Sequence, residues 1–79
     1  MDVEQKGERA AQILENEVFV EAVSGAKRRI RDSWTIAKSA PEREALWHQY
    51  QAIDAVTKEL AIIRDRGIVE RKRKELPSG

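Results

Sequence analysis

Residues 39–68 constrain the fold most, because they contain a helix with a start signal and a stop signal. Ser39 and Glu42 have the spacing of a capping box, and Pro41 lies in the first helical turn. Gly67 is expected to end this helix at residue 66, with Ile68 folding back on its last turn. Between these signals, apolar residues recur at steps of three and four, namely Leu46, Tyr50, Ile53, Val56, Leu60 and Ile63. One apolar face needs another helix to cover it, so the segment predicts an all-helical fold.

A second helix is predicted over residues 17–37, on the N-terminal side of the helix described above. Its apolar side chains share one face, and they are Phe19, Val23, Ala26, Ile30, Trp34 and Ala37. Because the connection is short, the helices at about 17–37 and 41–66 are expected to form an antiparallel helical hairpin. The expected contacts are Trp34 with Leu46 or Trp47, Ile30 with Tyr50, Val23 with Val56, and Phe19 with Leu60.

An additional N-terminal helix is predicted over about residues 2–14, with Asp2 as its cap. Asn16 is expected to interrupt the chain before the next helix, although one unbroken helix through Asn16 is the alternative. We expect this helix to cross the open end of the hairpin, near Ile62, Ile63 and Ile68. Residues 1–68 would then form a single helical domain. Residues 69–79 would form a basic C-terminal tail, partly disordered or helical.

The composition suggests that the chain needs help to be stable. It has 79 residues and no cysteine, and a core of this size is marginal without disulfides, metals or a partner. Self-association is therefore an expected source of stability. Fifteen Lys and Arg residues face 14 Asp and Glu residues, which argues against a function dominated by neutralising phosphates. No apolar run is long enough to span a bilayer, so no membrane partner is expected.

Nothing in the sequence has the pattern of a catalytic site. His48 is the only histidine, so no second histidine stands at helical ligand spacing, and the chain has no cysteine; no metal site is therefore expected. Glu42 and Glu44 lie in the first turn of a helix, where favourable interaction with the helix dipole explains them. No phosphate-binding loop or nucleophile motif is present. We therefore expect no enzymatic activity, no cofactor and no small-molecule substrate.

Two apolar residues lie beside the predicted apolar face of the helix at 41–66. Trp47 follows Leu46 and Ile62 precedes Ile63, so neither shares the direction of its neighbour. Burial within the chain is one explanation. The other is a partner interface, for which tryptophan is a frequent anchor. The residues predicted for that interface are Trp47 and Ile62, with Val3, Ile13 and Leu14 from the N-terminal helix.

Two basic clusters are candidates for nucleic-acid binding. On the second helix they are Lys27, Arg28 and Arg31, and in the tail they are Arg71, Lys72, Arg73 and Lys74. The alternative is a solvated face paired with acidic neighbours such as Glu21, Asp32 or Asp54. No aromatic residue alternates with either cluster, which argues against stacking on single-stranded bases.

Three segments carry a resemblance to known proteins: Glu8 to Phe19, Arg43 to Trp47, and Ile53 to Val56 together with Leu60. In their order and helical pattern, they resemble short all-helical proteins encoded among the structural and packaging genes of tailed bacteriophages and prophages. The resemblance implies a virion-associated or assembly role in a capsid, portal or packaging complex. It implies phage structural proteins or further copies of the chain as partners, in the virion or the host cytoplasm. The alternatives are a nucleic-acid-binding accessory protein and a small host-directed inhibitor.

Overall fold

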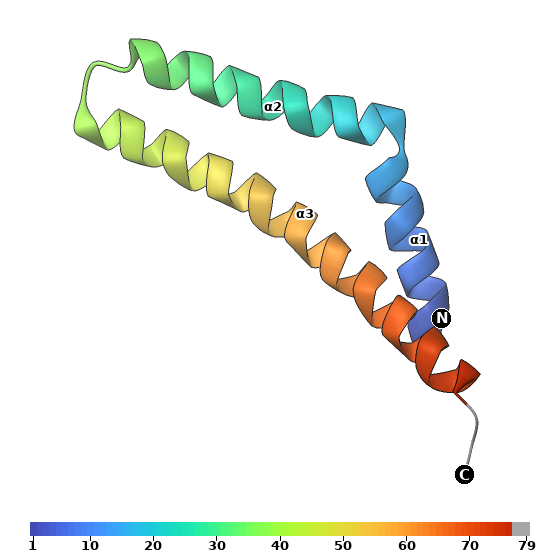
Figure 1. Cartoon of the computed structure of the whole chain (residues 1–79). Helices are drawn as coiled ribbons and strands as arrows, with labels where there is room; N and C mark the ends of the chain where they lie inside the picture. The colour runs from blue at the N-terminus through green and yellow to red at the C-terminus, as the bar shows by residue number, and fades with distance from the viewer. Residues whose placement is uncertain (77–79) are drawn as a thin grey trace.

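The computed structural model describes residues 1–76 and has three helices in chain order (Figure 1). Helix α1 spans Val3–Glu15, α2 spans Glu17–Ile36 and α3 spans Ala40–Glu75. No strand occurs in these residues. The predicted all-α fold is confirmed.

Side-chain caps define where α1 and α2 begin. The Asp2 carboxylate accepts from the Gln5 amide at 2.8 Å, and the Gln5 side chain accepts from the Asp2 amide at 3.1 Å. These reciprocal bonds form a capping box, which satisfies two amides at the free end of α1. The Asn16 side chain accepts from the Phe19 amide at 2.9 Å and caps α2. The predicted interruption at Asn16 is confirmed, because α1 and α2 lie on either side of it.

The connection between α2 and α3 is equally well bonded. Ser39 Oγ accepts from the Glu42 amide at 3.3 Å, as the capping signal predicts. The Glu42 carboxylate accepts from the Lys38 amide at 3.1 Å. The Arg43 guanidinium donates to the Ala37 carbonyl at 3.3 Å. These bonds hold residues 37–39 in a short turn between the two helices.

The expected end of the third helix at Gly67 is wrong, because α3 continues to Glu75. Gly67 is buried against Gly7 of α1. A Cβ atom on Gly67 would lie 2.9 Å from the Gly7 Cα, and one on Gly7 would lie 2.8 Å from the Gly67 Cα. These glycines therefore allow the backbones to approach closely, and Gly67 does not cap the helix. Residues 69–75 of the predicted tail are helical, and residues 77–79 lie outside the described part.

The three helices pack loosely against one another. From the connection, α2 and α3 diverge, and α1 returns to pack on the C-terminal half of α3 (Figure 1). Lys27 of α2 bonds to Asp54 of α3 at 2.8 Å, which fixes the level at which these helices meet. The radius of gyration is 17.6 Å, against about 12 Å for a globular chain of this length. The molecule is therefore elongated.

A seven-residue repeat forms the inner side of α3. Its members are Leu46, Tyr50, Ile53, Thr57, Leu60, Arg64 and Gly67, which alternate steps of four and three and are half-buried or buried. Five of the six residues of the predicted face are half-buried, namely Leu46, Tyr50, Ile53, Leu60 and Ile63, and Val56 is the exception. Val56 is 60% exposed, so its predicted contact with Val23 is wrong. Thr57 replaces it on the inner side, because this repeat keeps one side of α3 toward first α2 and then α1.

Very little of the chain is a true core. Among residues 1–76, Ala10 is the only apolar side chain that is buried, apart from glycines. The accessible surface is 6374 Å². A compact protein of this mass exposes about 4,900 Å², so the excess is on the order of 1,000 Å². Much apolar surface therefore remains uncovered in a single copy.

Candidate functional site

The first exposed apolar region lies between α2 and α3, near their connection. We call it the tryptophan hollow, and its lining consists of Ile30, Arg31, Trp34, Trp47 and Tyr50. The rings of Trp47 and Tyr50 stack with centroids 6.1 Å apart, and the Lys27 ammonium lies 5.1 Å from the Tyr50 centroid. The predicted neighbours Trp34 with Trp47 and Ile30 with Tyr50 line this one hollow. Both tryptophans stay more than 40% exposed, so the hollow is open to solvent.

The second region lies between the start of α1 and the C-terminal half of α3. We call it the Ile62 hollow, and Val3, Ile62, Asp65, Arg66, Val69 and Glu70 line it. Val3 and Ile62, both predicted for a partner interface, lie together here. Val69 was missed because it falls in the segment treated as a basic tail. Its position seven residues after Ile62 is the signal that finds it, since α3 is continuous through both.

Three exposed apolar residues that line the two hollows project toward the same side of α3. At 3.6 residues per turn, Trp47, Ile62 and Val69 project within about 60° of one another. Trp47 and Ile62 are separated by about 22 Å along the axis. Of the other predicted interface residues, Leu14 is half-buried and Ile13 is exposed on a different face of the molecule. Of the five predicted residues, the structure brings Val3 and Ile62 together, and Trp47 lines a separate hollow.

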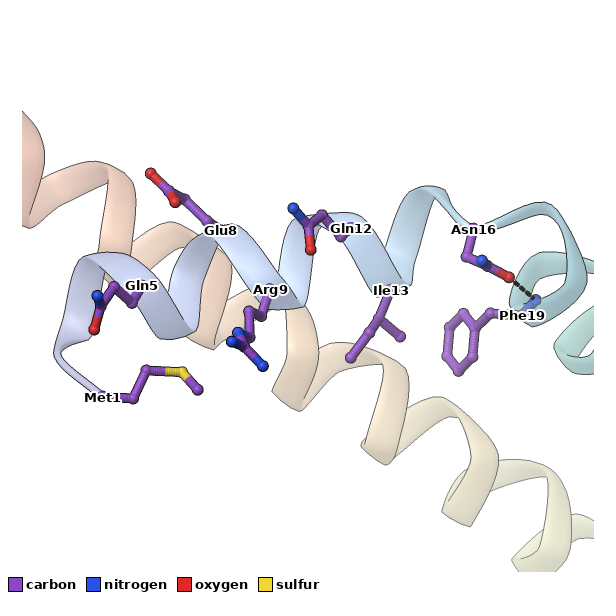
Figure 2. A pocket seen from close by; sticks show the side chains of 8 residues that line it. All are labelled: Met1, Gln5, Glu8, Arg9, Gln12, Ile13, Asn16 and Phe19. Atoms are coloured by element: carbon purple, nitrogen blue, oxygen red, sulfur yellow. Dashed lines mark hydrogen bonds between the residues drawn. The ribbon is translucent and has the colours of Figure 1, made fainter.

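A third hollow follows the outside of α1 (Figure 2), lined by Met1, Gln5, Glu8, Arg9, Gln12, Ile13, Asn16 and Phe19. Arg9, Ile13 and Phe19 point to one side of α1, and Glu8 and Gln12 point away from them (Figure 2). Charged and amide groups interrupt its apolar wall. The other two hollows, which have mostly apolar linings, are therefore better association surfaces.

Acidic residues of α1 contact the basic end of α3. The Arg71 guanidinium bonds to the Glu8 carboxylate and lies 4.0 Å from the Glu4 carboxylate. The Lys74 ammonium lies 2.9 Å from Glu4, and this hydrogen bond raises the pKa of Lys74. Arg71 and Lys74, both predicted to bind nucleic acid, therefore help to hold α1 on α3.

Two further basic candidates are also paired. Arg73 bonds to Glu70 at 2.6 Å, which lowers the pKa of Glu70. Lys27 bonds to Asp54, one of the acidic neighbours named in the alternative explanation. Arg28, Arg31 and Lys72 form no ion pair within residues 1–76. The two clusters are about 25 Å apart along α3, so they do not merge, and nucleic-acid binding stays a prediction.

No metal-binding group of three or more acidic or histidine side chains occurs in the part of the chain that the structure describes. Within the same residues, no helix is both long and apolar enough to cross a membrane. No family model, curated protein or solved structure matches the chain. The described residues combine uncovered apolar surface with a small core.

The Lys27–Asp54 bond predicts how stability depends on pH. Hydrogen bonding to Lys27 lowers the pKa of Asp54 below 3.8, and the bond to Asp54 raises the pKa of Lys27 above 10.5. The contribution of Asp54 is present above about pH 4 and is lost as the pH falls through its lowered pKa. That of Lys27 is present below about pH 10.5 and is lost as the pH rises through its raised pKa. The melting temperature is therefore expected to fall at both extremes.

Circular dichroism at a series of pH values measures this dependence. Asp54→Asn should flatten the acid side of the profile, whereas Asp32→Asn, on the exposed surface of α2, should leave it unchanged. Equal profiles for the wild type and Asp54→Asn would contradict a stabilising bond.

Proposed function

We propose that this chain is a non-enzymatic association protein whose working unit is an antiparallel hairpin of α2 and α3, braced by α1. The observation that supports the proposal is the near absence of buried apolar side chains beside two hollows with apolar walls. A chain with so little core gains stability when another surface covers its apolar residues. Association is therefore what this geometry serves best.

The resemblance to phage structural and packaging proteins supplies the setting. In that setting, the chain acts within a capsid, portal or packaging complex of a tailed bacteriophage. Such particles are symmetric, so many copies of one small protein can occupy equivalent positions. An elongated shape with apolar residues along one side suits a protein that fills a joint between larger subunits.

Docking through the Ile62 hollow is the proposed mechanism. Its walls are the apolar side chains of Val3, Ile62 and Val69, and its rim carries Asp65, Arg66 and Glu70. An apolar centre with a charged rim is the arrangement found in specific protein interfaces. The centre supplies affinity by excluding water, and the rim orients the partner.

Site-specific photo-cross-linking in particles tests this proposal. A photoreactive amino acid replaces Ile62 in one variant and Val56 in another, and phage particles are assembled with each. We expect the chain to co-purify with particles, and position 62, but not position 56, to form cross-links whose partner, a particle protein or a second copy of the chain, is identified by mass spectrometry. Val56 is exposed on the opposite side of α3, so it is the matched control. Absence of the chain from particles would refute the setting, and equal cross-linking would refute the surface.

A further inference from the structure

We propose that two copies of this chain form an antiparallel, two-fold dimer in which Trp47 of each copy enters the Ile62 hollow of the other. This inference rests on the proposed association function and names a partner and a contact for it. The side of α3 that carries the two hollows is the dimer face.

The positions of the two features on α3 are the first argument. The midpoint between Trp47 and Ile62 falls between Asp54 and Ala55, each of the two residues lying about 11 Å from it, and this is the level at which Lys27 of α2 bonds to α3. In a two-fold dimer, each feature must meet its complement on the other copy. An antiparallel α3 pair centred on that point places Trp47 opposite Ile62 at both ends. The two-fold axis repeats this contact, so the Ile62 hollow of each copy is filled.

The shapes of the two features are complementary. The Trp47 indole is 48% exposed and stacks on Tyr50, so it is held in place and still protrudes. The Ile62 hollow has a volume of about 450 Å³ and apolar walls. Tryptophan side chains that enter such apolar sites are the most frequent anchors of protein interfaces.

Helix α2 gives independent support. Lys27 is bonded to Asp54, so it lies close to the proposed two-fold axis. Trp34 and Val20 lie seven residues on either side of Lys27, and both are exposed on the side of α2 that carries Lys27. The same rotation that pairs Trp47 with Ile62 brings Trp34 opposite Val20 of the other copy. Four exposed apolar side chains per copy thus find apolar partners.

The charges near the axis are balanced within each copy. Asp54 bonds to Lys27 at 2.8 Å and lies 3.4 Å from Lys58. In the antiparallel register, Lys58 faces Gln51 of the other copy, which is uncharged. On α2, the axis brings the two Lys27 residues together, and Asp54 neutralises each of them.

The available area is sufficient for a dimer. The face extends over about 40 Å of α3 and is between one and two helices wide, which gives on the order of 600 Å² per copy. Stable interfaces begin at about 1,200 Å² in total. The excess exposed surface of one copy, on the order of 1,000 Å², covers this requirement.

Single-cysteine cross-linking tests the axis directly, because the full chain contains no cysteine. Ala55→Cys places a thiol near the axis on the dimer face, and a short bis-maleimide should join two copies efficiently. Val56→Cys is its neighbour and projects to the opposite side of α3, so it should cross-link poorly. Equal yields from both variants would overturn the proposed face.

Sedimentation equilibrium of the full chain tests the contact. We expect a reversible dimer, with Trp47→Ala and Ile62→Ala each weakening association at least about thirtyfold. Val56→Ala should match the wild type. If circular dichroism shows that Trp47→Ala is unfolded, the Ile62→Ala variant decides alone. A wild type that stays monomeric at millimolar concentration, or an Ile62→Ala dimer of unchanged affinity, would overturn the proposal.

These outcomes are separable from those for the proposed function. A monomeric protein that still cross-links to particles from position 62 refutes the dimer and leaves the association function standing. A dimer that is absent from particles supports the inference and refutes the phage setting.

Discussion

Gly67→Ala is expected to destabilise the protein by about 2 kcal/mol, although alanine is the better helix former. A methyl group at this position would lie 2.9 Å from the Gly7 Cα, 3.2 Å from the Val3 carbonyl oxygen and 3.5 Å from the Gly7 nitrogen. The nearest of these atoms belong to backbone, which cannot rotate away as a side chain does. Helix α1 must therefore move off α3, and its contacts with Arg71 and Lys74 weaken at the same time.

Gly25→Ala is the matched control for this substitution. A methyl group there would meet no atom within 4 Å, so only helix propensity changes. We expect it to stabilise the chain by about 1 kcal/mol. Thermal unfolding followed by circular dichroism should show melting temperatures that move in opposite directions, by about 4–8 °C per kcal/mol. If both variants are stabilised, α1 does not pack on α3 through these glycines.

Ala10→Asn is the second substitution with a large expected effect, a loss of about 2–3 kcal/mol. Ala10 is 3% exposed, so the new amide would be buried away from water. A buried polar group without partners costs about 1–3 kcal/mol, and asparagine adds a few tenths more through its lower helix propensity.

Ala52→Asn separates these two terms, because Ala52 is exposed on α3 and loses only helix propensity. Urea denaturation should give a clearly lower midpoint for Ala10→Asn and a nearly unchanged one for Ala52→Asn. Similar midpoints would mean that Ala10 is accessible in solution and that α1 is not docked.

Local signals in the sequence predicted the helix starts well. Asp2, Asn16 and Ser39 each have a short polar side chain that bonds to the amide three residues later, and such bonds depend on neighbours alone. The boundary between α1 and α2 followed from the same chemistry. These features could be predicted from the sequence because they do not depend on distant parts of the chain.

The packing role of Gly67 could not be predicted from such local signals. A glycine after an apolar helical face predicts a helix end, and only the position of Gly7 on a distant helix changes that interpretation. The wrong helix end at Gly67 led to two further errors in the residues that follow it. Val69 was assigned to a tail, and the acidic partners of Arg71 and Lys74 were not anticipated.

The drift of the inner side of α3 explains the other error. The predicted face steps from Ile53 to Val56 to Leu60, whereas the observed inner side of α3 steps from Ile53 to Thr57 to Leu60. Along its length α3 contacts first α2 and then α1. The inner side therefore follows a seven-residue repeat, and it includes Thr57 and Arg64 in place of apolar residues. Trp47 and Ile62 were found because each is an apolar residue next in sequence to a member of the predicted face, Leu46 or Ile63.

The contact between Gly7 and Gly67 also sets the order in which the chain gains structure during synthesis. The ribosome makes α1 before it makes the part of α3 on which α1 packs. Thirteen residues are too few to hold a stable helix in water alone. Helix α1 therefore becomes ordered only after residue 67 has been synthesised, although it is made earlier than α3.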